Sequence, residues 1–558
     1  MVKYVFVTGG VLSGIGKGVV TASIGKLFQF RGYNVDAMKI DPYLNVDPGT
    51  LNPIEHGEVY VCEEVWKFQP VPGQVFNIAE VDQDFGTYER FLDVNMHPQN
   101  NITSGQIYLS IVLKERFGEY LGKTVQVIPH VTNEIKKRIV NASHRRNPDI
   151  LVVEVGGTVG DIETMPYLEA IRQLRLEYPR DHTVLVHVTL IPYLGTVGQH
   201  KTKPTQHSVK VLQSMGLQPD IIIGRSDKPL PEDVKEKISL FCNVPKNAVI
   251  SDPDLETIYD LPLIFEEQGL GELLCQLLGL NNVVKHDMVN EWKTLVERFK
   301  NTRDVIHIAM VGKYCRITDS YISINEALKH AGGYFKTRVR LNFIESEEFE
   351  NNPEKLSILK SYDGILLTPG FGVRGVEGMI MSAQYALRNK IPLLGICFGA
   401  QLLFIAFARE FLGLRDANST EVKPDAAHPV VDLLEEQKKT QALGGTMKLA
   451  ARRIIVRKDT KLYKAYNSTE IIERFRHRYN IVPYYASIAE EKGLVVSSYD
   501  AEDNSICSIE IRDAWIVGVQ FHPEFKSRPN KPSPIYLEFI RHILEDKKKK
   551  QIKNTHNL

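Results

Sequence analysis

One cysteine has the surroundings of a catalytic nucleophile. Cys397 stands between Gly395 and Gly399, at the end of the apolar run of residues 391–396. This pattern predicts a strand that ends in a sharp turn into a helix, where glycines tolerate a backbone that bulkier residues would strain. A thiol in such an elbow can attack a carbonyl carbon once a base has taken its proton.

A base and its orienting partner occur much later in the chain. His522 and Glu524 follow the largely apolar residues 515–521, and their spacing can place both side chains on one face. The alternative is a buried core cysteine and an unrelated surface histidine, which either half taken alone would favour. The two halves together, in this order, indicate catalysis through a cysteine.

Length and charge restrict the class of protein. A chain of 558 residues is too long for one hydrophobic core, so we expect at least two domains. The 68 basic and 68 acidic residues cancel, which argues against a general nucleic-acid-binding or membrane-surface protein. No apolar run reaches membrane-spanning length. The six cysteines include no C-x-x-C pair, so we expect a reduced, cytoplasmic protein.

Short β-rich runs alternate with helical stretches. In the first half the expected strands are residues 4–7, 35–40, 124–128, 150–155, 183–189 and 221–223. Buried strands separated by helices indicate a parallel α/β sheet. A second set, at residues 305–311, 339–343, 364–368 and 392–396, indicates a second α/β domain. The expected division is a first domain over residues 1–279, a linker helix within 280–302, a second domain over 303–545 and a disordered basic tail over 546–558.

A glycine-rich segment follows the first expected strand and opens a helix. Residues 8–18 read Thr-Gly-Gly-Val-Leu-Ser-Gly-Ile-Gly-Lys-Gly. Backbone N–H groups and the helix N-terminus would face a phosphate, and Lys17 would add a point charge; a glycine-rich structural turn is the alternative. Gly18 stands where the P-loop consensus has the Ser or Thr that binds Mg²⁺. Carboxylates must then hold the metal, and the candidates are Asp84 and Glu154.

Further polar clusters follow strands of the first half. Lys39 and Asp41 end the second expected strand, and Asp161 follows a later one. Ligands of open parallel sheets bind beyond the carboxyl ends of the strands, so these residues are expected to line one site. Residues 201–207 form a basic, hydroxyl-rich loop that suits a second polyphosphate; a solvated surface turn is the alternative.

Together these segments resemble the CTP synthases, the glutamine-dependent amidoligases that convert UTP to CTP. The resemblance rests on residues 7–18, 39–50, 56–59, 154–163, 201–208, 417–421, 444–447 and 476–479. It implies an α/β protein of two doubly wound domains. The first would be a P-loop-like parallel-sheet amidoligase similar to dethiobiotin synthetase, and the second a class I glutamine amidotransferase.

The resemblance implies that ATP phosphorylates O4 of UTP, which makes it a good leaving group, and that ammonia then attacks C4. The residues it assigns to ATP are Gly14, Ile15, Gly16, Lys17, Gly18, Val19, Asp84 and, near the adenine, Asp254. Asp84 and Glu154 would bind Mg²⁺. The residues it assigns to UTP, several shared with the feedback inhibitor CTP, are Ser13, Lys39, Asp161, Ile162, Glu163, Lys201, Thr202, Lys203, Pro204, Thr205, Gln206 and Lys237.

In the second half the resemblance implies that Cys397 attacks the amide of L-glutamine, with His522 as base and then acid and Glu524 as its orienting group. The residues expected to bind glutamine are Gly370, Phe398, Gly399, Ala400, Gln401, Glu421 and Arg478, with the N–H groups of Gly370 and Phe398 as the oxyanion hole. The family further implies a closed ammonia tunnel, activation by GTP near Arg374 and residues 444–447, and a homotetramer able to form filaments.

Three departures from the family pattern stand out. Pro369 precedes Gly370 where the family usually has glycine, which restricts the loop and removes an N–H donor. Lys448 replaces a common arginine, so activation by GTP can differ. Residues 63–81 include an insertion with Trp66 and Phe68, for which an intersubunit contact is one hypothesis.

Two alternatives remain. Another glutamine-fed, ATP-dependent amidoligase, such as a cobyrinic-acid amidating enzyme, would share the phosphate loop and the amidotransferase half. It explains the loop of residues 201–206 less well. A non-catalytic assembly protein is a different class, and the intact set of Cys397, His522 and Glu524 argues against it.

Overall fold

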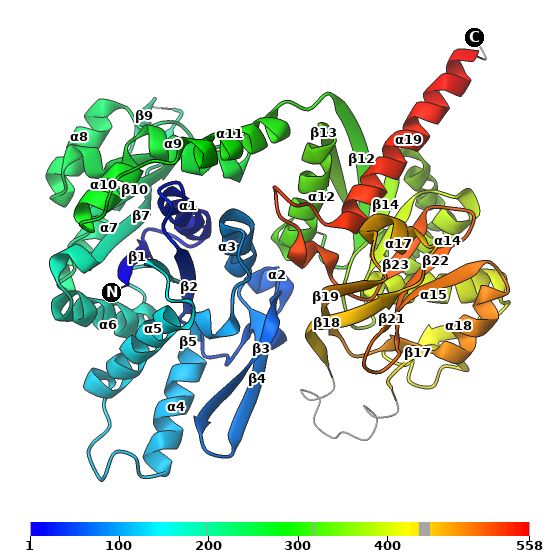
Figure 1. The fold of residues 1–558 in the computed structure, drawn as a ribbon, viewed down its shortest axis with the longest axis horizontal. Helices are drawn as coiled ribbons and strands as arrows, with labels where there is room; N and C mark the ends of the chain where they lie inside the picture. Colours follow the sequence, from blue (N-terminus) through cyan, green and yellow to red (C-terminus); the bar gives the residue numbers. More distant parts are fainter. Residues whose placement is uncertain (1, 197, 316–317, 435–446, 557–558) are drawn as a thin grey trace. The chain divides into compact units, whose positions relative to one another are not determined.

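The computed structural model describes residues 2–196, 198–315, 318–434 and 447–556. They form two compact units (Figure 1), the first comprising residues 1–50 and 66–300 and the second residues 51–65 and 301–558. The expected division into two domains at one linker does not include one feature of these units. The segment Leu51–Val65 comes from the N-terminal half of the sequence but belongs to the second unit. No helix in the described part of the chain is long and apolar enough to span a membrane.

The first unit is built on a seven-stranded sheet whose neighbouring strands are all parallel. In spatial order the strands are β11 (Val249–Pro253), β10 (Ile221–Ser226), β7 (Thr183–Leu190), β1 (Lys3–Gly9), β6 (Ile150–Val155), β2 (Val35–Asp41) and β5 (Asn101–Thr103). The strands β2, β5 and β6 lie on one side of β1, and the later strands β7, β10 and β11 lie on the other side. Ligands of open α/β sheets bind at such a change of side, beyond the carboxyl ends of the strands.

Helices cover both faces of this sheet, as its almost wholly buried strands require. One core joins Phe6 and Met38 of the sheet to helices α4, α5 and α6, while α1 packs on the other side with α3 and α9. The helices are α1 (Lys17–Gln29), α3 (Asp84–Leu92), α4 (Ser104–Arg116), α5 (Thr132–Arg146), α6 (Met165–Glu177), α7 (Lys203–Ser214), α8 (Glu232–Cys242), α9 (Leu261–Glu267), α10 (Leu270–Leu277) and α11 (His286–Lys300). A short hairpin, β8 (Tyr193–Leu194) and β9 (Gln199–His200), precedes α7.

The strand expected at residues 124–128 is wrong. Residues 123–126 have no regular structure, and a π-helical turn spans Val127–Val131. Val127 and Ile128 are 47% and 53% exposed, so this apolar run is not core. Pro129 ends the run and cannot donate a hydrogen bond to a neighbouring strand.

The insertion forms a long hairpin of β3 (Tyr60–Val71) and β4 (Gln74–Val81). Its aromatic side chains cluster: the ring centroids of Trp66 and Phe68 lie 5.0 Å apart, and those of Phe68 and Phe76 lie 5.9 Å apart. The guanidinium of Arg138 lies over the Phe68 ring at 4.9 Å. The insertion is thus anchored to α5, and its suggested intersubunit role stays a hypothesis.

The second unit has a nine-stranded mixed sheet. In spatial order its strands are β13 (Thr337–Glu345), β12 (Asp304–Gly312), β14 (Gly364–Leu367), β15 (Leu393–Ile396), β23 (Ile516–Val519), β22 (Ile506–Ile511), β21 (Leu494–Asp500), β18 (Lys448–Val456) and β19 (Glu470–His477). The pairs from β13 to β23 are parallel, and those from β23 to β19 are antiparallel. A smaller sheet contains β16 (Ala417–Ser419), β17 (His428–Asp432) and β20 (Asn480–Ile481).

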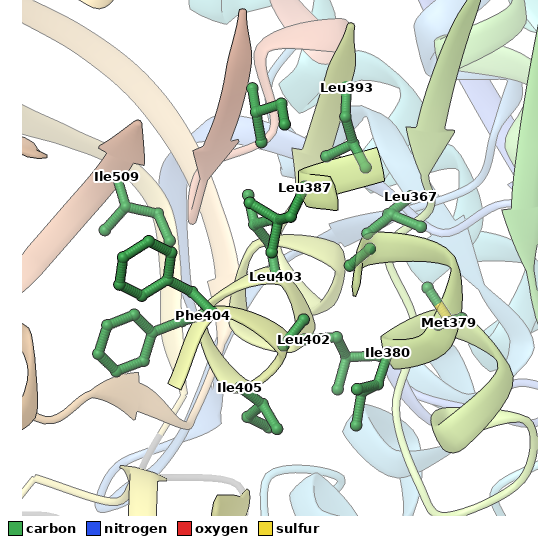
Figure 2. Close-up of a cluster of buried hydrophobic side chains, with 14 of the residues drawn as sticks. Leu367, Met379, Ile380, Leu387, Leu393, Leu402, Leu403, Phe404, Ile405 and Ile509 are labelled. Carbon is green, nitrogen blue, oxygen red and sulfur yellow. The ribbon is translucent and has the colours of Figure 1, made fainter. Parts of the chain in front are cut away.

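Helix α15 forms the centre of one core of this unit. Figure 2 shows Leu402, Leu403 and Phe404 of α15 among Met379 and Ile380 of α14 and the side chains of several strands. The helices of the unit are α2 (Pro53–His56), α12 (Ile322–Tyr334), α13 (Glu347–Asn351), α14 (Val376–Asn389), α15 (Phe398–Phe411), α17 (Lys461–Tyr466), α18 (Pro483–Glu490) and α19 (Pro534–His556). The burial of α15 fixes the position of the residue before it, Cys397.

The tail expected to be disordered from residue 546 is instead helical. Helix α19 continues to His556. Arg541 bonds to Glu538 and Glu545 at the spacings i−3 and i+4, and Lys549 lies 3.7 Å from Asp546. Such pairs support a helix, and Lys and Gln, which fill residues 547–551, have good helix propensity.

Helix α11 lies where a linker helix was expected and belongs to the first unit. Its Trp292 is only 8% exposed and donates a hydrogen bond from Nε1 to the carbonyl of Tyr259 at 2.8 Å. The ring of Phe91 lies 5.7 Å from Trp292, and Lys26 Nζ lies 4.5 Å above the indole. One aromatic side chain therefore anchors α11 to α1 and α3.

We predict that Trp292→Ala destabilises the first unit by about 3–5 kcal/mol, because it removes a large buried side chain and its hydrogen bond. Differential scanning calorimetry would detect the lower transition temperature. Lys293→Ala, at an exposed position of the same helix, is the control. Equal transition temperatures for the two variants would contradict the anchoring role of Trp292.

Candidate functional site

Cys397 occupies a strained turn between β15 and α15. Its φ and ψ are 52° and −104°, and a positive φ is uncommon for a residue with a side chain. A Cβ atom on Gly399 would lie 2.3 Å from the carbonyl oxygen of Leu367, and one on Gly395 would lie 2.8 Å from that of Gly399. The two flanking glycines thus permit the close backbone packing that presents the thiol.

His522 and Glu524 lie next to this thiol, just beyond β23. His522 Nδ1 is 2.7 Å from Glu524 Oε1, and the His522 backbone N–H donates to the carbonyl of Arg474 at 2.8 Å. All three members of the triad are buried. Cys397 Sγ lies 3.5 Å from the carbonyl of Arg476, to which it donates. Cys397 and His522, which lie 125 residues apart in the sequence (522 − 397), therefore meet in space.

The charge of Glu524 controls the imidazole. Burial by itself lowers the pKa of His522, but Glu524 and the adjacent Cys397 outweigh that effect and raise the pKa to about 10. The imidazolium form therefore persists through the neutral range. A protonated imidazole beside a thiol can stabilise a thiolate and later give a proton to a leaving amine.

A pocket opens over the triad. Cys397, His522 and Glu524 line it together with the loop of residues 369–371. Pro53, Glu58 and Val59 of the segment Leu51–Val65 also line it. The N-terminal half of the sequence thus supplies part of this pocket.

The predicted oxyanion loop lies against α15. A Cβ on Gly370 would be 3.7 Å from Phe398 Cδ1, so the two residues expected to supply N–H groups are neighbours. Pro369 accepts a hydrogen bond on its carbonyl from the Tyr321 hydroxyl at 3.3 Å. The Tyr321 hydroxyl therefore helps to hold the loop that contains Pro369.

The residues expected to bind glutamine surround the elbow. Gly399 and Ala400 form the first turn of α15. Gln401 is buried, and its Nε2 donates to the carbonyl of Tyr479 at 2.8 Å, while its Oε1 has no hydrogen-bond partner among the described residues. Glu421 accepts from the Gly372 N–H at 2.8 Å and interacts with Arg478. Gln401 Oε1 could accept a hydrogen bond from a polar ligand, and the Arg478 guanidinium could donate one.

Lys313 is a further polar residue of this site that the sequence did not single out. It is 2% exposed, its Nζ lies 4.3 Å from the Phe398 ring centroid, and it donates to the carbonyls of Phe371 and Gly372. Burial lowers the pKa of Lys313 to about 8, although Glu421 opposes that shift. Lys313 follows β12 in sequence, which is the one signal that could have identified it.

The residues expected near GTP are divided. Arg374 lies over the Tyr314 ring at 5.5 Å and pairs with Glu347 at 2.8 Å. Gly444, Gly445 and Thr446 lie outside the described residues. Lys448 is buried, with Asp503 at 2.6 Å and Asp500 at 3.6 Å, so its charge is matched within the protein.

In the first unit the candidate phosphate loop runs from β1 to α1. Gly14 and Gly16 have φ values of 73° and 86°, which glycine adopts without strain. Lys17 Nζ donates to the carbonyl of Gly157 at 2.9 Å. The N–H of Gly10 bonds to the carbonyl of Val188, and that of Val159 to the carbonyl of Gly9. The loops after β1, β6 and β7 are thus joined at one edge of the sheet.

Lys39 is the centre of a buried charged cluster at this edge. Its Nζ bonds to Asp84 and lies 2.6 Å from Glu154 Oε1 and 3.8 Å from Asp82. Tyr88 donates to the other oxygen of Glu154 at 2.5 Å. Burial alone would lower the pKa of Lys39, but Asp84 and Glu154 outweigh it and raise that pKa well above its ordinary value. Asp82 and Tyr88 were not expected in this cluster.

The Asp84 carboxylate lies directly beside the Cα atom of Gly18. A Cβ at position 18 would lie 2.1 Å from Asp84 Oδ1. The carboxylate therefore fills the space that a Ser or Thr side chain would need. Carboxylate oxygens are ligands that Mg²⁺ prefers, and Mg²⁺ usually binds one or two of them together with substrate phosphates. Asp84 and Glu154 fit that requirement beside the phosphate loop.

A pocket of ≈ 360 Å³ lies beside the phosphate loop. Gly14, Ile15, Tyr193 and Asp254 line part of it. Asp254 Oδ1 is 2.5 Å from the guanidinium of Arg225. The structure thus places Asp254, which follows β11, near the loop at the start of the chain.

The candidate UTP residues differ in exposure. Ser13, Asp161, Ile162, Glu163, Lys203 and Lys237 are exposed, Lys201 and Pro204 are half-buried, and Thr202, Thr205 and Gln206 are buried. Thr205 bonds to Thr189 at 2.9 Å, and Gln206 to Thr202 at 3.0 Å. The buried members therefore shape the start of α7, while the lysines remain accessible. The Lys203 ammonium lies 5.9 Å from the Phe241 ring on α8, the helix that carries Lys237.

We predict that Glu524→Gln slows alkylation of Cys397 by iodoacetamide about tenfold at neutral pH. Without the carboxylate, burial dominates and the pKa of His522 falls, so the imidazolium is lost at a lower pH. Mass spectrometry across the neutral and alkaline range would give the rates. Glu510→Gln removes another buried carboxylate, one that caps α17, and should leave the rate unchanged. Equal rates in all three proteins would contradict the role of Glu524.

Comparison with known proteins assigns the family. A model of the CTP synthase N-terminus matches residues 3–280, and a model of class I glutamine amidotransferases matches residues 316–542. The CTP synthase of Carboxydothermus hydrogenoformans is 48% identical over 98% of this chain and 100% of its own length, and that of Pyrococcus abyssi is 49% identical over 99% of each. A solved glutaminase domain of Trypanosoma brucei CTPS, with bound acivicin, is 32% identical, covers 43% of this chain and 94% of that one, and has a TM-score of 0.41. The chain belongs to the CTP synthase family.

Proposed function

We infer that this protein catalyses the ATP-dependent amination of UTP to CTP with ammonia taken from glutamine. The main observation behind this conclusion is the sequence identity of 48–49% to CTP synthases over almost the whole chain. The contact of His522 with Glu524, the turn at Cys397 and the glycine-rich turn before α1 support the two halves of such a reaction.

In the first unit we propose phosphoryl transfer from ATP to O4 of UTP. The phosphate loop of residues 13–19 and Lys17 would hold the ATP phosphates, and Lys39 would offset charge between the two triphosphates. Asp84 and Glu154 would hold Mg²⁺, which would supply positive charge beside the transferred phosphoryl group. Ammonia then forms the bond to C4, and the bond from C4 to the phosphorylated oxygen breaks, which releases phosphate.

Residues at the carboxyl-terminal edge of the first sheet would make the remaining nucleotide contacts. The pocket lined by Ile15, Tyr193 and Asp254 would take the adenine end of ATP, since it adjoins the phosphate loop. Lys201, Lys203 and the turn of residues 161–163 would bind UTP, and several of these residues would also bind the inhibitor CTP. The assignment of Lys237 rests on the family alone.

In the second unit we propose that Cys397 attacks the amide carbon of L-glutamine. Before the attack, the proton of the Cys397 thiol would pass to His522 and give a thiolate–imidazolium pair, the form that the raised pKa of His522 favours. His522 would then protonate the departing ammonia, while Glu524 holds the imidazole. The N–H groups of Gly370 and Phe398 would stabilise the oxyanion. Water then hydrolyses the thioester to glutamate. Arg478 would bind the substrate carboxylate, with Glu421 and Gln401 near the ammonium.

We further propose that the ammonia stays enclosed. Free ammonia is protonated in neutral water and loses its nucleophilicity, so a closed route is needed. The wall formed by Pro53, Glu58 and Val59 beside Cys397 supports a start of that route at the segment Leu51–Val65.

Regulation and assembly are proposed from the family. GTP would activate glutamine hydrolysis near Arg374, CTP would inhibit, and the protein would form a homotetramer able to build filaments. The buried pairing of Lys448 with two aspartates supports a weaker part for this lysine in binding GTP. A cytoplasmic location fits the six free cysteines, because Cys397 must remain a thiol.

The direct test is incubation with UTP, ATP, Mg²⁺ and ammonia, followed by chromatography of the nucleotides. CTP is the expected product. Absence of CTP, together with amidation of a carboxylate substrate, would favour the other class of amidoligase.

We predict that Cys397→Ala reduces glutamine-dependent CTP synthesis at least about 10³-fold, since a triad acts as a unit. Synthesis from ammonia should be unchanged, because ammonia reaches the ligase site without the thiol. Both rates are measured on the same preparation. Retained turnover of glutamine would show that Cys397 is not the nucleophile.

We predict that Gly18→Ser, which restores the P-loop consensus, lowers ammonia-dependent CTP synthesis at least about tenfold by displacing Asp84. Alkylation of Cys397 by iodoacetamide, measured in parallel, should stay at the rate of the parent protein. A serine variant as active as the parent would refute the steric argument.

A further inference from the structure

The segment Leu51–Val65 is held to the rest of the second unit at two places. Glu58 accepts hydrogen bonds from the Ser323 backbone N–H and hydroxyl at the start of α12. Farther along, Glu63 lies 3.5 Å from Lys526. The strand between them is buried, with Tyr60, Val61 and Cys62 all at 0% exposure. Such burial makes the segment a structural part of the glutaminase unit.

Arg474 on β19 joins this segment to the catalytic base. Its side chain is fully buried and donates to the Tyr60 hydroxyl at 3.0 Å and to the Val61 carbonyl at 2.8 Å. The guanidinium also lies 5.4 Å from the Tyr60 ring centroid. The backbone carbonyl of the same residue accepts the N–H of His522. One residue of β19 therefore holds both the segment and the backbone of the base.

Aromatic packing makes a second connection to the base. The Tyr60 ring meets the Phe525 ring at a centroid distance of 4.9 Å and an angle of 66°, and its hydroxyl donates to the Phe525 carbonyl at 2.8 Å. The Phe525 ring in turn stacks on the His522 imidazole at 5.1 Å and 14°. Phe525 is thus held between the base and the segment.

We propose that Tyr60 is a positioning residue for His522, acting through Phe525 and held in place by Arg474. This inference rests on the proposed hydrolysis of glutamine at Cys397. Edge-to-face and stacked aromatic contacts fix ring orientation, and an error of about 1 Å in a catalytic group can cost about 10²-fold in rate. The segment from the N-terminal half of the sequence therefore sets the orientation of the base.

Tyr60 meets Phe525 through ring packing and a hydrogen bond. The ring of Tyr60 rather than its hydroxyl should carry the effect, since the Phe525 carbonyl also accepts from Arg528 at 2.9 Å and Arg474 keeps its bond to Val61.

The test compares Tyr60→Ala with Tyr60→Phe in the full-length protein. For Tyr60→Ala we expect kcat for glutamine-dependent CTP synthesis to fall at least about tenfold. KM for glutamine and the ammonia-dependent rate should be unchanged. Tyr60→Phe, which keeps the ring, should restore kcat. The matched control is Val61→Ala, which also truncates a buried side chain of this strand, because adjacent strand residues point to opposite faces.

The outcomes separate this inference from the proposed site. If Cys397→Ala still consumes glutamine, the site itself is wrong. If Cys397→Ala is inactive with glutamine but Tyr60→Ala retains its kcat, only the positioning role is refuted. An equal loss of kcat in Val61→Ala would also refute it, because that loss would reflect general loosening. Should Tyr60→Ala lose the ammonia-dependent rate through unfolding, Tyr60→Leu is measured instead, and an unchanged glutamine kcat there overturns the proposal.

Discussion

The parallel pairing of β15 with β23 determines the chemistry of the second unit. Ile396 pairs with Val519 at the carboxyl ends of these strands, so the residues that follow must share one edge of the sheet. Cys397 then donates its N–H to the carbonyl of Val519 at 2.7 Å, and His522 emerges beside it. The strained backbone of the cysteine persists because the core around α15 leaves no alternative path for the chain.

The first unit uses register in the same way. Lys39 on β2 is the register partner of Glu154 on β6, and Glu154 is also the partner of Val7 on β1. Side chains in register on neighbouring strands point to the same face. A lysine and a carboxylate far apart in sequence therefore come together beside the phosphate loop that follows β1. Asp84, at the start of α3, completes the cluster by occupying the space above Gly18.

Local patterns were sufficient for much of the site. The elbow around Cys397, the pair of His522 and Glu524, and the glycines of the phosphate loop can be recognised because each depends on neighbours within a few residues. The prediction for residues 124–128 was wrong for the same reason. Their composition suits a strand, but a strand also needs a neighbouring strand to pair with, and local sequence does not show whether one is present. The charged tail was misjudged because side-chain pairing along α19 supports a helix that composition alone does not indicate.

The sequence by itself determined the two α/β domains, the strand-to-helix elbow at Cys397 and the glycine-rich turn between β1 and α1. Only the tertiary structure decided that the segment Leu51–Val65 belongs to the second unit, that Lys313 and Arg474 are buried at its site, and that Gly18 makes room for Asp84. The physical reason is the range of the interactions. Turn chemistry and hydrophobic periodicity act between near neighbours in the chain, whereas burial, register and aromatic packing join residues whose separation no local pattern encodes.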